Sequence, residues 1–196
     1  MDYIFLIGPS AVGKTTLAKA LHEHYQGVYI EQNMVPEFGI PENVPDVGDY
    51  EETLCWENVL CQLDFFHRKG CLPIIALDFD DRRARELPQL FQGSKFVILR
   101  LFSSDPGQIL RQMIHRRDHE GGLFAPDNVE HSNAVIRQRP LLPNEAKLDV
   151  AGKNKEEVFR EALQIINTFQ PALDYSYTLP PETYYLSWVQ SRQNTP

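Results

Sequence analysis

The sequence predicts an α/β fold in three layers, with helices covering both faces of a five-stranded parallel sheet. Short apolar segments alternate with segments of helical periodicity along the chain, and this alternation is typical of a parallel sheet. The chain has 196 residues, of which 42% are hydrophobic and 23% charged, as is usual for one globular domain. A chain of this length buries enough surface to form a core without disulfides or metal.

Each element follows from its local pattern. Five short, continuous apolar segments are predicted as strands: residues 3–7, 28–30, 72–77, 95–102 and 146–150. Six segments with apolar residues at helical spacing are predicted as helices: residues 14–25, 50–69, 83–91, 105–117, 127–137 and 155–169. Three prolines and two glycines in residues 32–49 predict an irregular connection, and long connections are often functional.

Turn and capping residues indicate where the helices begin and end. Gly70 follows the second helix, as glycine often does at a helix C-terminus. Pro106 lies in the first turn of the fourth helix, with Ser104 or Asp105 as its cap. The pair 121–122, both glycine, breaks the chain between the fourth and fifth helices.

The net charge of −8 is unevenly distributed. Residues 20–67 contain ten of the 27 acidic residues and none of the 19 basic ones. Such a surface repels a phosphate backbone, so we expect no nucleic acid partner. The three cysteines form no CxxC pair, no apolar run is long enough to cross a membrane, and the first residues lack the pattern of a secretory signal. These features predict a cytoplasmic protein without a membrane partner.

The loop after the first strand carries the phosphate-binding pattern GxxxxGK[ST]. It reads Gly8-Pro9-Ser10-Ala11-Val12-Gly13-Lys14-Thr15, and Thr16 follows it in the helix. In this setting backbone amides surround phosphate oxygens, and the helix N-terminus adds partial positive charge. Lys14 is expected to reach the β- and γ-phosphates, and Thr15 to offer its hydroxyl to Mg²⁺. The motif predicts a P-loop NTPase fold that binds ATP with Mg²⁺.

Three further segments after the phosphate-binding loop can be compared with those of known protein families. The third strand ends in Asp78, and the string Asp78-Phe79-Asp80-Asp81-Arg82 places a carboxylate and an arginine four residues apart. The fourth helix carries three arginines, which are Arg111, Arg116 and Arg117. The fifth strand is followed by the loop Ala151-Gly152-Lys153.

With these segments, residues 3–169 resemble the nucleoside-monophosphate kinase and shikimate kinase branch of P-loop kinases. The resemblance implies a kinase domain at 1–169, with an acceptor-binding region at about 31–69 and a mobile lid at about 116–142. It implies that Asp78 holds a Mg²⁺-bound water or the acceptor, and that Arg82 contacts the acceptor unless Asp80 or Asp81 pairs with it. Lid arginines such as Arg116 and Arg117 would stabilise the transferring phosphoryl group, with Arg111 in a nucleotide-binding or structural role.

The same resemblance implies that Gly152 and Lys153 lie in a loop that contacts adenine through its backbone. A competing interpretation compares residues 154–157, Asn-Lys-Glu-Glu, with the guanine-specifying NKxD pattern. Residues 170–196 carry several aromatics and prolines, and we expect this extension to pack on the domain or on a partner subunit, which leaves a homodimer open.

The acceptor region predicts the chemistry of the second substrate. Glu31 ends the second strand, and either Glu31 or Asp78 could take the proton of an acceptor hydroxyl, with Glu37 as a third candidate. Because residues 20–67 offer no cation to an anionic acceptor, we expect a neutral or cationic one: a nucleoside, a sugar or an antibiotic-like compound. Four aromatic rings could stack on such a molecule or belong to the core: those of Tyr50, Trp56, Phe65 and Phe66.

The predicted function is therefore an ATP-dependent small-molecule kinase. Two alternatives are a nucleoside-monophosphate kinase and, in another class, an ATPase or GTPase switch that acts through a protein partner. The arginine-bearing lid favours a kinase over the switch, because arginines that close over the phosphoryl group stabilise its transfer.

Overall fold

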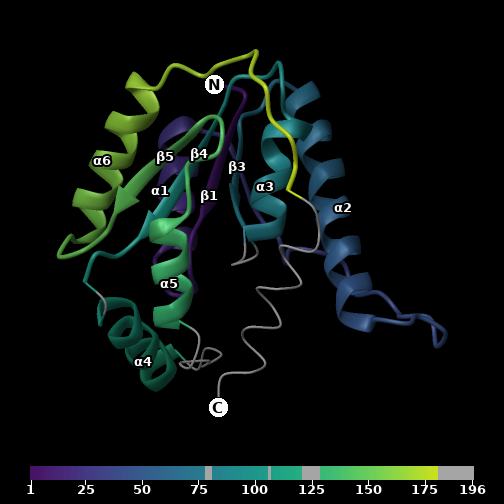
Figure 1. Cartoon of the computed structure of the whole chain (residues 1–196), viewed down its shortest axis with the longest axis horizontal. Coiled ribbons are helices and arrows are strands. Elements are labelled where there is room, and N and C mark those ends of the chain that lie inside the picture. The colour runs from purple at the N-terminus through teal and green to yellow at the C-terminus, as the bar shows by residue number, and fades with distance from the viewer. Residues whose placement is uncertain (78–80, 106, 121–128, 181–196) are drawn as a thin grey trace.

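The computed structural model describes residues 1–77, 81–105, 107–120 and 129–180, and it has the predicted α/β architecture (Figure 1). The strands are β1 (Tyr3–Ile7), β2 (Val28–Glu31), β3 (Pro73–Ala76), β4 (Phe96–Phe102) and β5 (Glu145–Asp149). The helices are α1 (Lys14–Tyr25), α2 (Val47–Arg68), α3 (Asp81–Leu90), α4 (Gln108–Glu120), α5 (Val129–Gln138) and α6 (Lys155–Thr168). The expectation of a five-stranded parallel sheet with helices on both faces is confirmed.

The sheet places the loop after β1 at its centre. The strand order is β2-β3-β1-β4-β5, and all strand pairings are parallel, with Phe5 of β1 opposite both Ile75 of β3 and Ile98 of β4. The chain extends from β1 to β2 and β3 on one side and to β4 and β5 on the other. Ligands of such sheets bind at the carboxyl ends of the strands where the order reverses, and here that place is the loop after β1.

Alternating side chains of the strands build a core on each face of the sheet. In β1, Ile4 and Leu6 pack with α1 and α6, whereas Phe5 and Ile7 pack with α2 and α3. This alternation follows from the two-residue period of a strand. The central strands are apolar on both faces for that reason, which is the pattern that identified them in the sequence.

Most element boundaries differ from the sequence prediction by one to three residues, and the starts of α2 and α4 are among the largest differences. Helix α2 begins at Val47 and not at residue 50, because the Asp46 carboxylate accepts a hydrogen bond from the amide of Asp49 at 3.0 Å. Helix α4 begins at Gln108, and the Asp105 carboxylate before it accepts a hydrogen bond from the amide of Gly107 at 3.0 Å. Pro106 and the glycine pair 121–122 lie outside the described residues.

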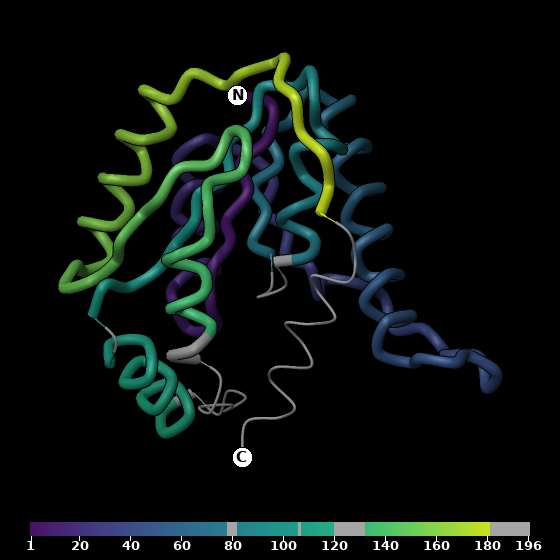
Figure 2. Tube along the Cα trace, viewed as in Figure 1, coloured from purple at the N-terminus to yellow at the C-terminus, as the bar shows by residue number. Residues whose placement is uncertain are grey.

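The chain after α6 crosses the molecule from α6 to α3 (Figure 2). The side chain of Asn144 exchanges two hydrogen bonds with the backbone of Ala172, and the amide of Gly93 donates to the carbonyl of Leu173. The hydroxyls of Tyr175 and Tyr177 donate to the backbone carbonyls of α3 at Pro88 and Arg85. Residues 170–180 therefore lie against this chain's own domain. No helix in the described ranges is long and apolar enough to cross a membrane.

Candidate active site

The phosphate-binding loop has the backbone geometry that its glycines predict. Gly8 has φ +150°, and a Cβ there would lie 2.5 Å from the carbonyl oxygen of Leu101, so only glycine fits. Gly13 has φ +104° and stands at the N-cap of α1 without a side-chain cap. The first amides of α1 are therefore open to a ligand, and an anion such as a phosphate is the ligand that a helix N-terminus favours.

Lys14 is folded back over this loop. Its ammonium donates to the carbonyl oxygens of Gly8 at 2.9 Å and Pro9 at 3.1 Å, and the residue is only 9% exposed. A buried ammonium needs such partners when no phosphate is bound. The contacts hold the charge at the mouth of the loop, where an entering phosphate would replace the carbonyls.

The end of β2 brings a carboxylate to the beginning of α1. The Thr15 hydroxyl donates to Oε1 of Glu31 at 2.5 Å, and the Tyr29 hydroxyl donates to the same oxygen. Burial, and then the hydrogen bond to Glu31, raise the pKa of Tyr29, which keeps its hydroxyl protonated as a donor. Thr15 thus presents a hydroxyl oxygen, a donor type that Mg²⁺ prefers, and the Glu31 carboxylate orients it.

This donor set suits a magnesium ion that reaches the protein together with a nucleotide. Within the described ranges, no group of three or more histidine, cysteine, aspartate or glutamate residues could hold a metal alone. Mg²⁺ commonly takes one or two protein oxygens and completes its shell with phosphates and water. Asp78, the other expected metal residue, lies outside the described residues.

A cavity of about 800 Å³ joins these elements. Its walls are the phosphate-binding loop and the start of α1, Glu31 from β2, the inner side of α4, and the segment from β5 into α6. The expected nucleotide residues that line it are Ser10, Ala11, Val12, Gly13, Lys14, Thr15, Thr16, Arg111 and Lys153. The volume lies in the range of small-molecule sites.

The three arginines of α4 have different surroundings. Arg111 and Arg116 line the cavity, whereas Arg117 is not among its walls and pairs with Asp118 at 2.7 Å on the exposed side of the helix. Arg111 forms an exposed ion pair with Asp105 at 2.5 Å, and this hydrogen bond holds the pKa of Asp105 below its usual value. Arg116 is therefore better placed than Arg117 to reach a phosphate in this conformation.

The loop between β5 and α6 is held in place by its own hydrogen bonds. Gly152 has φ +66°, and the ammonium of Lys153 donates to the carbonyl of Asp149 at 2.6 Å. Asn154 caps α6 by accepting from the amide of Glu157, whose carboxylate accepts from the amide of Asn154. The first and last side chains of the suggested NKxD pattern, Asn154 and Glu157, are used in this capping box. This use argues against guanine recognition through them.

Two arginines at the start of α3 form ion pairs with carboxylates. Arg82 pairs with Asp49 of α2 at 2.7 Å, a partner that the sequence analysis did not name. The buried Arg83 pairs with Glu52 at 2.6 Å and with Glu86 at 2.7 Å. The pairs with Asp49 and Glu52 join α3 to α2. Because carboxylates already neutralise Arg82 and Arg83, these two arginines offer little charge to an anionic acceptor.

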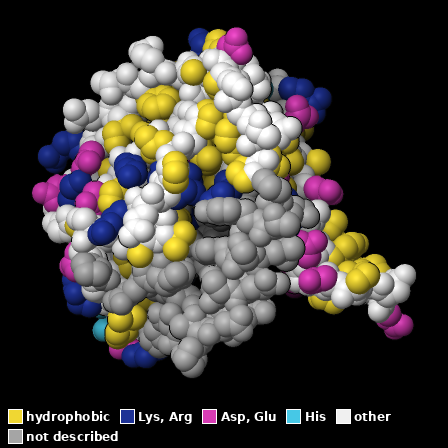
Figure 3. Space-filling model, viewed as in Figure 1, with side chains coloured by type: hydrophobic (Ala, Val, Ile, Leu, Met, Phe, Trp, Pro, Cys, Tyr) yellow, Lys and Arg dark blue, Asp and Glu magenta, His cyan; other side chains and the backbone are white. Residues whose placement is uncertain are grey.

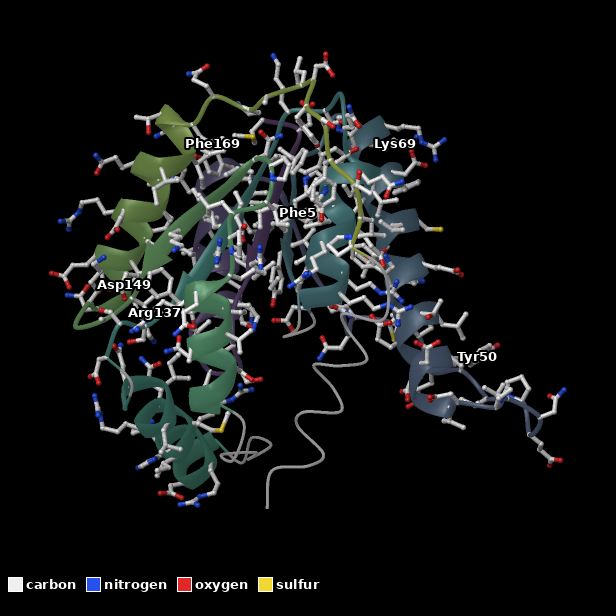
Figure 4. The ribbon with its side chains drawn as sticks, viewed as in Figure 1. Phe5, Tyr50, Lys69, Arg137, Asp149 and Phe169 are labelled. Atoms are coloured by element: carbon white, nitrogen blue, oxygen red, sulfur yellow. The ribbon has the colours of Figure 1, made fainter. Side chains whose placement is uncertain are left out.

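Two of the aromatic residues considered for stacking are placed differently. Trp56 of α2 is 2% exposed, packs in the core between α2 and the sheet, and donates its indole N–H to Glu86 at 2.8 Å. This placement argues against a stacking role for Trp56. Tyr50 lies at the outer end of α2 (Figure 4), where acidic and hydrophobic side chains cover the projecting segment (Figure 3).

Sequence reasoning missed a buried ionic cluster that anchors α5. Arg100 and Glu145 are fully buried and pair at 2.9 Å, and Arg139 pairs with the same carboxylate at 2.7 Å. The Arg100 guanidinium also donates to the carbonyls of Ile136 and Arg139 at 2.6 Å each. Arg139 therefore helps to attach the end of the expected lid segment to strands β4 and β5. An arginine inside the apolar strand β4 was the available signal.

Tyr29 and Gln108 were missed as well. Tyr29 contacts Glu31 as described, and Gln108 at the start of α4 donates to the carbonyl of Val150 at 3.2 Å and accepts from the amide of Gly152 at 3.3 Å. Gln108 therefore links α4 to the loop after β5. Val150 and Gly152 are more than 40 residues from Gln108, so no local pattern marks this link.

Comparison with known proteins establishes the fold. No protein-family model matches the chain, and no curated protein matches its sequence. A sugar kinase from Janibacter has a TM-score of 0.60 and 21% identity, covering 89% of this chain and 98% of its own. The tunicamycin resistance protein of Deinococcus radiodurans has a TM-score of 0.57 and 21% identity, covering 87% and 98%. A gluconokinase from Sinorhizobium meliloti has a TM-score of 0.55 and 17% identity, covering 98% and 97%.

Proposed function

We propose that the chain is an ATP-dependent phosphotransferase that moves the γ-phosphoryl group of ATP to a hydroxyl of a neutral or cationic small molecule. The observation that carries this proposal is the cavity that joins the phosphate-binding loop to Glu31 and to the arginines of α4. The proposal is supported by the fold that the chain shares with kinases of known structure. Because one fold can host many reactions, the proposal also depends on the residues of the site.

At the donor side, the loop amides and Lys14 bind the phosphates of ATP. Lys14 exchanges its contacts to Gly8 and Pro9 for phosphate oxygens, so its charge is already at the site before the nucleotide arrives. Thr15, with Asp78 as the expected second residue, would hold Mg²⁺, which when bound neutralises charge on the β- and γ-phosphates. Arg116, aided by Arg111, stabilises the negative charge of the transferring group.

At the acceptor side, Glu31 receives the proton of the attacking hydroxyl. The acceptor oxygen forms a bond to the γ-phosphorus as the bond to the β–γ bridging oxygen breaks, and ADP leaves with that oxygen. Because transfer depends mostly on positioning and electrostatics, Glu31 contributes chiefly by orienting the hydroxyl.

Charge selects the acceptor class. Arg82 and Arg83 pair with Asp49, Glu52 and Glu86, and residues 20–67 contain no lysine or arginine. An acceptor phosphate or carboxylate would meet these acids without compensation, which is costly in a partly buried site. A hydroxyl compound without negative charge avoids that cost.

The test measures ADP formation with a panel of nucleosides, nucleoside monophosphates, sugars and aminoglycosides, with phosphorus NMR to identify the product. We expect turnover with a member of the neutral or cationic classes and none in Lys14→Ala prepared in parallel. Preference for a monophosphate would refute the charge argument. ATP hydrolysis that requires a protein partner and yields no phosphorylated small molecule would favour the switch.

A further inference from the structure

Tyr29 contacts the proposed proton acceptor Glu31 but has no role in the reaction described above. It stands two residues before Glu31 on the edge strand β2, so the two side chains share the face of the sheet that is covered by α1. Ile30 between them is 1% exposed in the core of the opposite face. The strand therefore fixes the backbone that carries Tyr29 and Glu31, while the tyrosine remains half-buried beside the cavity wall.

The two oxygens of Glu31 have unequal surroundings. Oε1 accepts hydrogen bonds from the hydroxyls of both Thr15 and Tyr29. Oε2 receives no hydrogen bond from any residue in the part of the chain that the structure describes. Since Glu31 lines the cavity, the carboxylate has one oxygen committed to the protein and one left for a ligand.

The Tyr29 ring is itself held in place. The ammonium of Lys19, one turn along α1 from Thr15, lies 5.6 Å from the ring centroid. The ring packs against the core cluster that α1 shares with the sheet. Its hydroxyl can therefore act as a fixed hydrogen-bond donor to Glu31.

We propose that Tyr29 is a positioning residue that holds Glu31 against Thr15, so that Oε1 orients the Thr15 hydroxyl and Oε2 is kept for the acceptor. A threonine hydroxyl has one hydrogen and two lone pairs. When its hydrogen points to Glu31, its lone pairs point away and are available to a cation held by the phosphates. Without Tyr29, Glu31 regains rotamer freedom and this alignment is lost for part of the time.

The inference rests on the proposed function but is tested without an acceptor. Titration calorimetry measures the affinity for ADP with and without Mg²⁺ in the wild type, Tyr29→Phe, Glu31→Gln and the double variant. Tyr25→Phe is the matched control, because the Tyr25 hydroxyl also makes one side-chain hydrogen bond, to Asn167 at 3.2 Å, and is not among the residues lining the cavity. Thermal unfolding of each variant reports folding.

We expect Mg²⁺ to increase ADP affinity in the wild type and in Tyr25→Phe, and Tyr29→Phe to lose about tenfold of this gain while its affinity for ADP alone is unchanged. In the Glu31→Gln background, Tyr29→Phe should add no further loss, because it acts through Glu31. Equal losses with and without Mg²⁺, additive losses in the double variant, or a wild type without any gain would each overturn the inference.

The two proposals fail separately. If Tyr29→Phe behaves as expected but no acceptor in the panel is phosphorylated, the positioning role stands and the proposed reaction falls. If an acceptor is phosphorylated and Tyr29→Phe keeps the full gain from Mg²⁺, the reaction stands and the role of Tyr29 falls.

Discussion

Replacing Arg100 with methionine removes the central cation of the buried cluster beneath α5. The methionine keeps most of the side-chain length but loses the ion pair to Glu145 at 2.9 Å and the two hydrogen bonds to the carbonyls of Ile136 and Arg139. Both Arg100 and Glu145 are 0% exposed, so water cannot replace the lost partner. The expected result is a large loss of stability, although Arg100 is not among the residues that line the cavity.

The magnitude follows from the burial of the pair. Breaking a buried ion pair by removing one partner costs about 3–5 kcal/mol, because the other charge stays buried. Arg139 still pairs with Glu145 at 2.7 Å, so the lower half of this range applies. For a domain of this size, 3 kcal/mol corresponds to a decrease in melting temperature of roughly 6–12 °C.

The assay is thermal unfolding followed by circular dichroism, with urea unfolding as a second measurement. Arg137→Met is the matched control, because Arg137 is an exposed cation on α5, the helix that the cluster anchors. Its loss should change stability by less than about 0.5 kcal/mol. If Arg100→Met unfolds at the same temperature as Arg137→Met, the cluster does not stabilise the attachment of α5 to the sheet, and the reasoning is wrong.

Three further predictions concern the site and its support. Lys14→Ala should reduce turnover by about 10²–10³-fold with little change in melting temperature, as measured by steady-state kinetics; unchanged turnover would exclude Lys14 from the reaction. Trp56→Phe should cost about 1.5–3 kcal/mol in urea unfolding by losing its bond to Glu86, with the acceptor KM unchanged if the ring belongs to the core. Burial opposes ionisation of Asp149, but hydrogen bonds from Ser104 and the backbone outweigh it and lower its pKa. Its contribution to stability should therefore be complete above pH 3.8 and decline below it, so urea unfolding should show the wild type losing its advantage over Asp149→Asn only in acid.

The donor half of the site was predictable from the sequence because its determinants are local. The positive φ of Gly13, the missing Cβ of Gly8 and the position of Lys14 all belong to one eight-residue segment between a strand and a helix. The alternation of strands and helices likewise depends on periodicities within each segment, and every predicted strand and helix is present.

The acceptor half was less predictable because its contacts join distant segments. Nothing near Arg82 in the sequence shows that it pairs with Asp49, which is 33 residues away. Trp56 has the chemistry of a stacking residue, but the packing of α2 and α3 against the sheet buries it.

The amino-acid sequence by itself determined the order of the elements, the phosphate-binding loop and the absence of cations in residues 20–67. Only the tertiary structure decided which carboxylate meets which cation, that Arg100 and Glu145 are buried together, and that Thr15 and Tyr29 share one oxygen of Glu31. The physical reason is that backbone conformation depends on near neighbours in the chain, whereas the free energy of a charge depends on its neighbours in space.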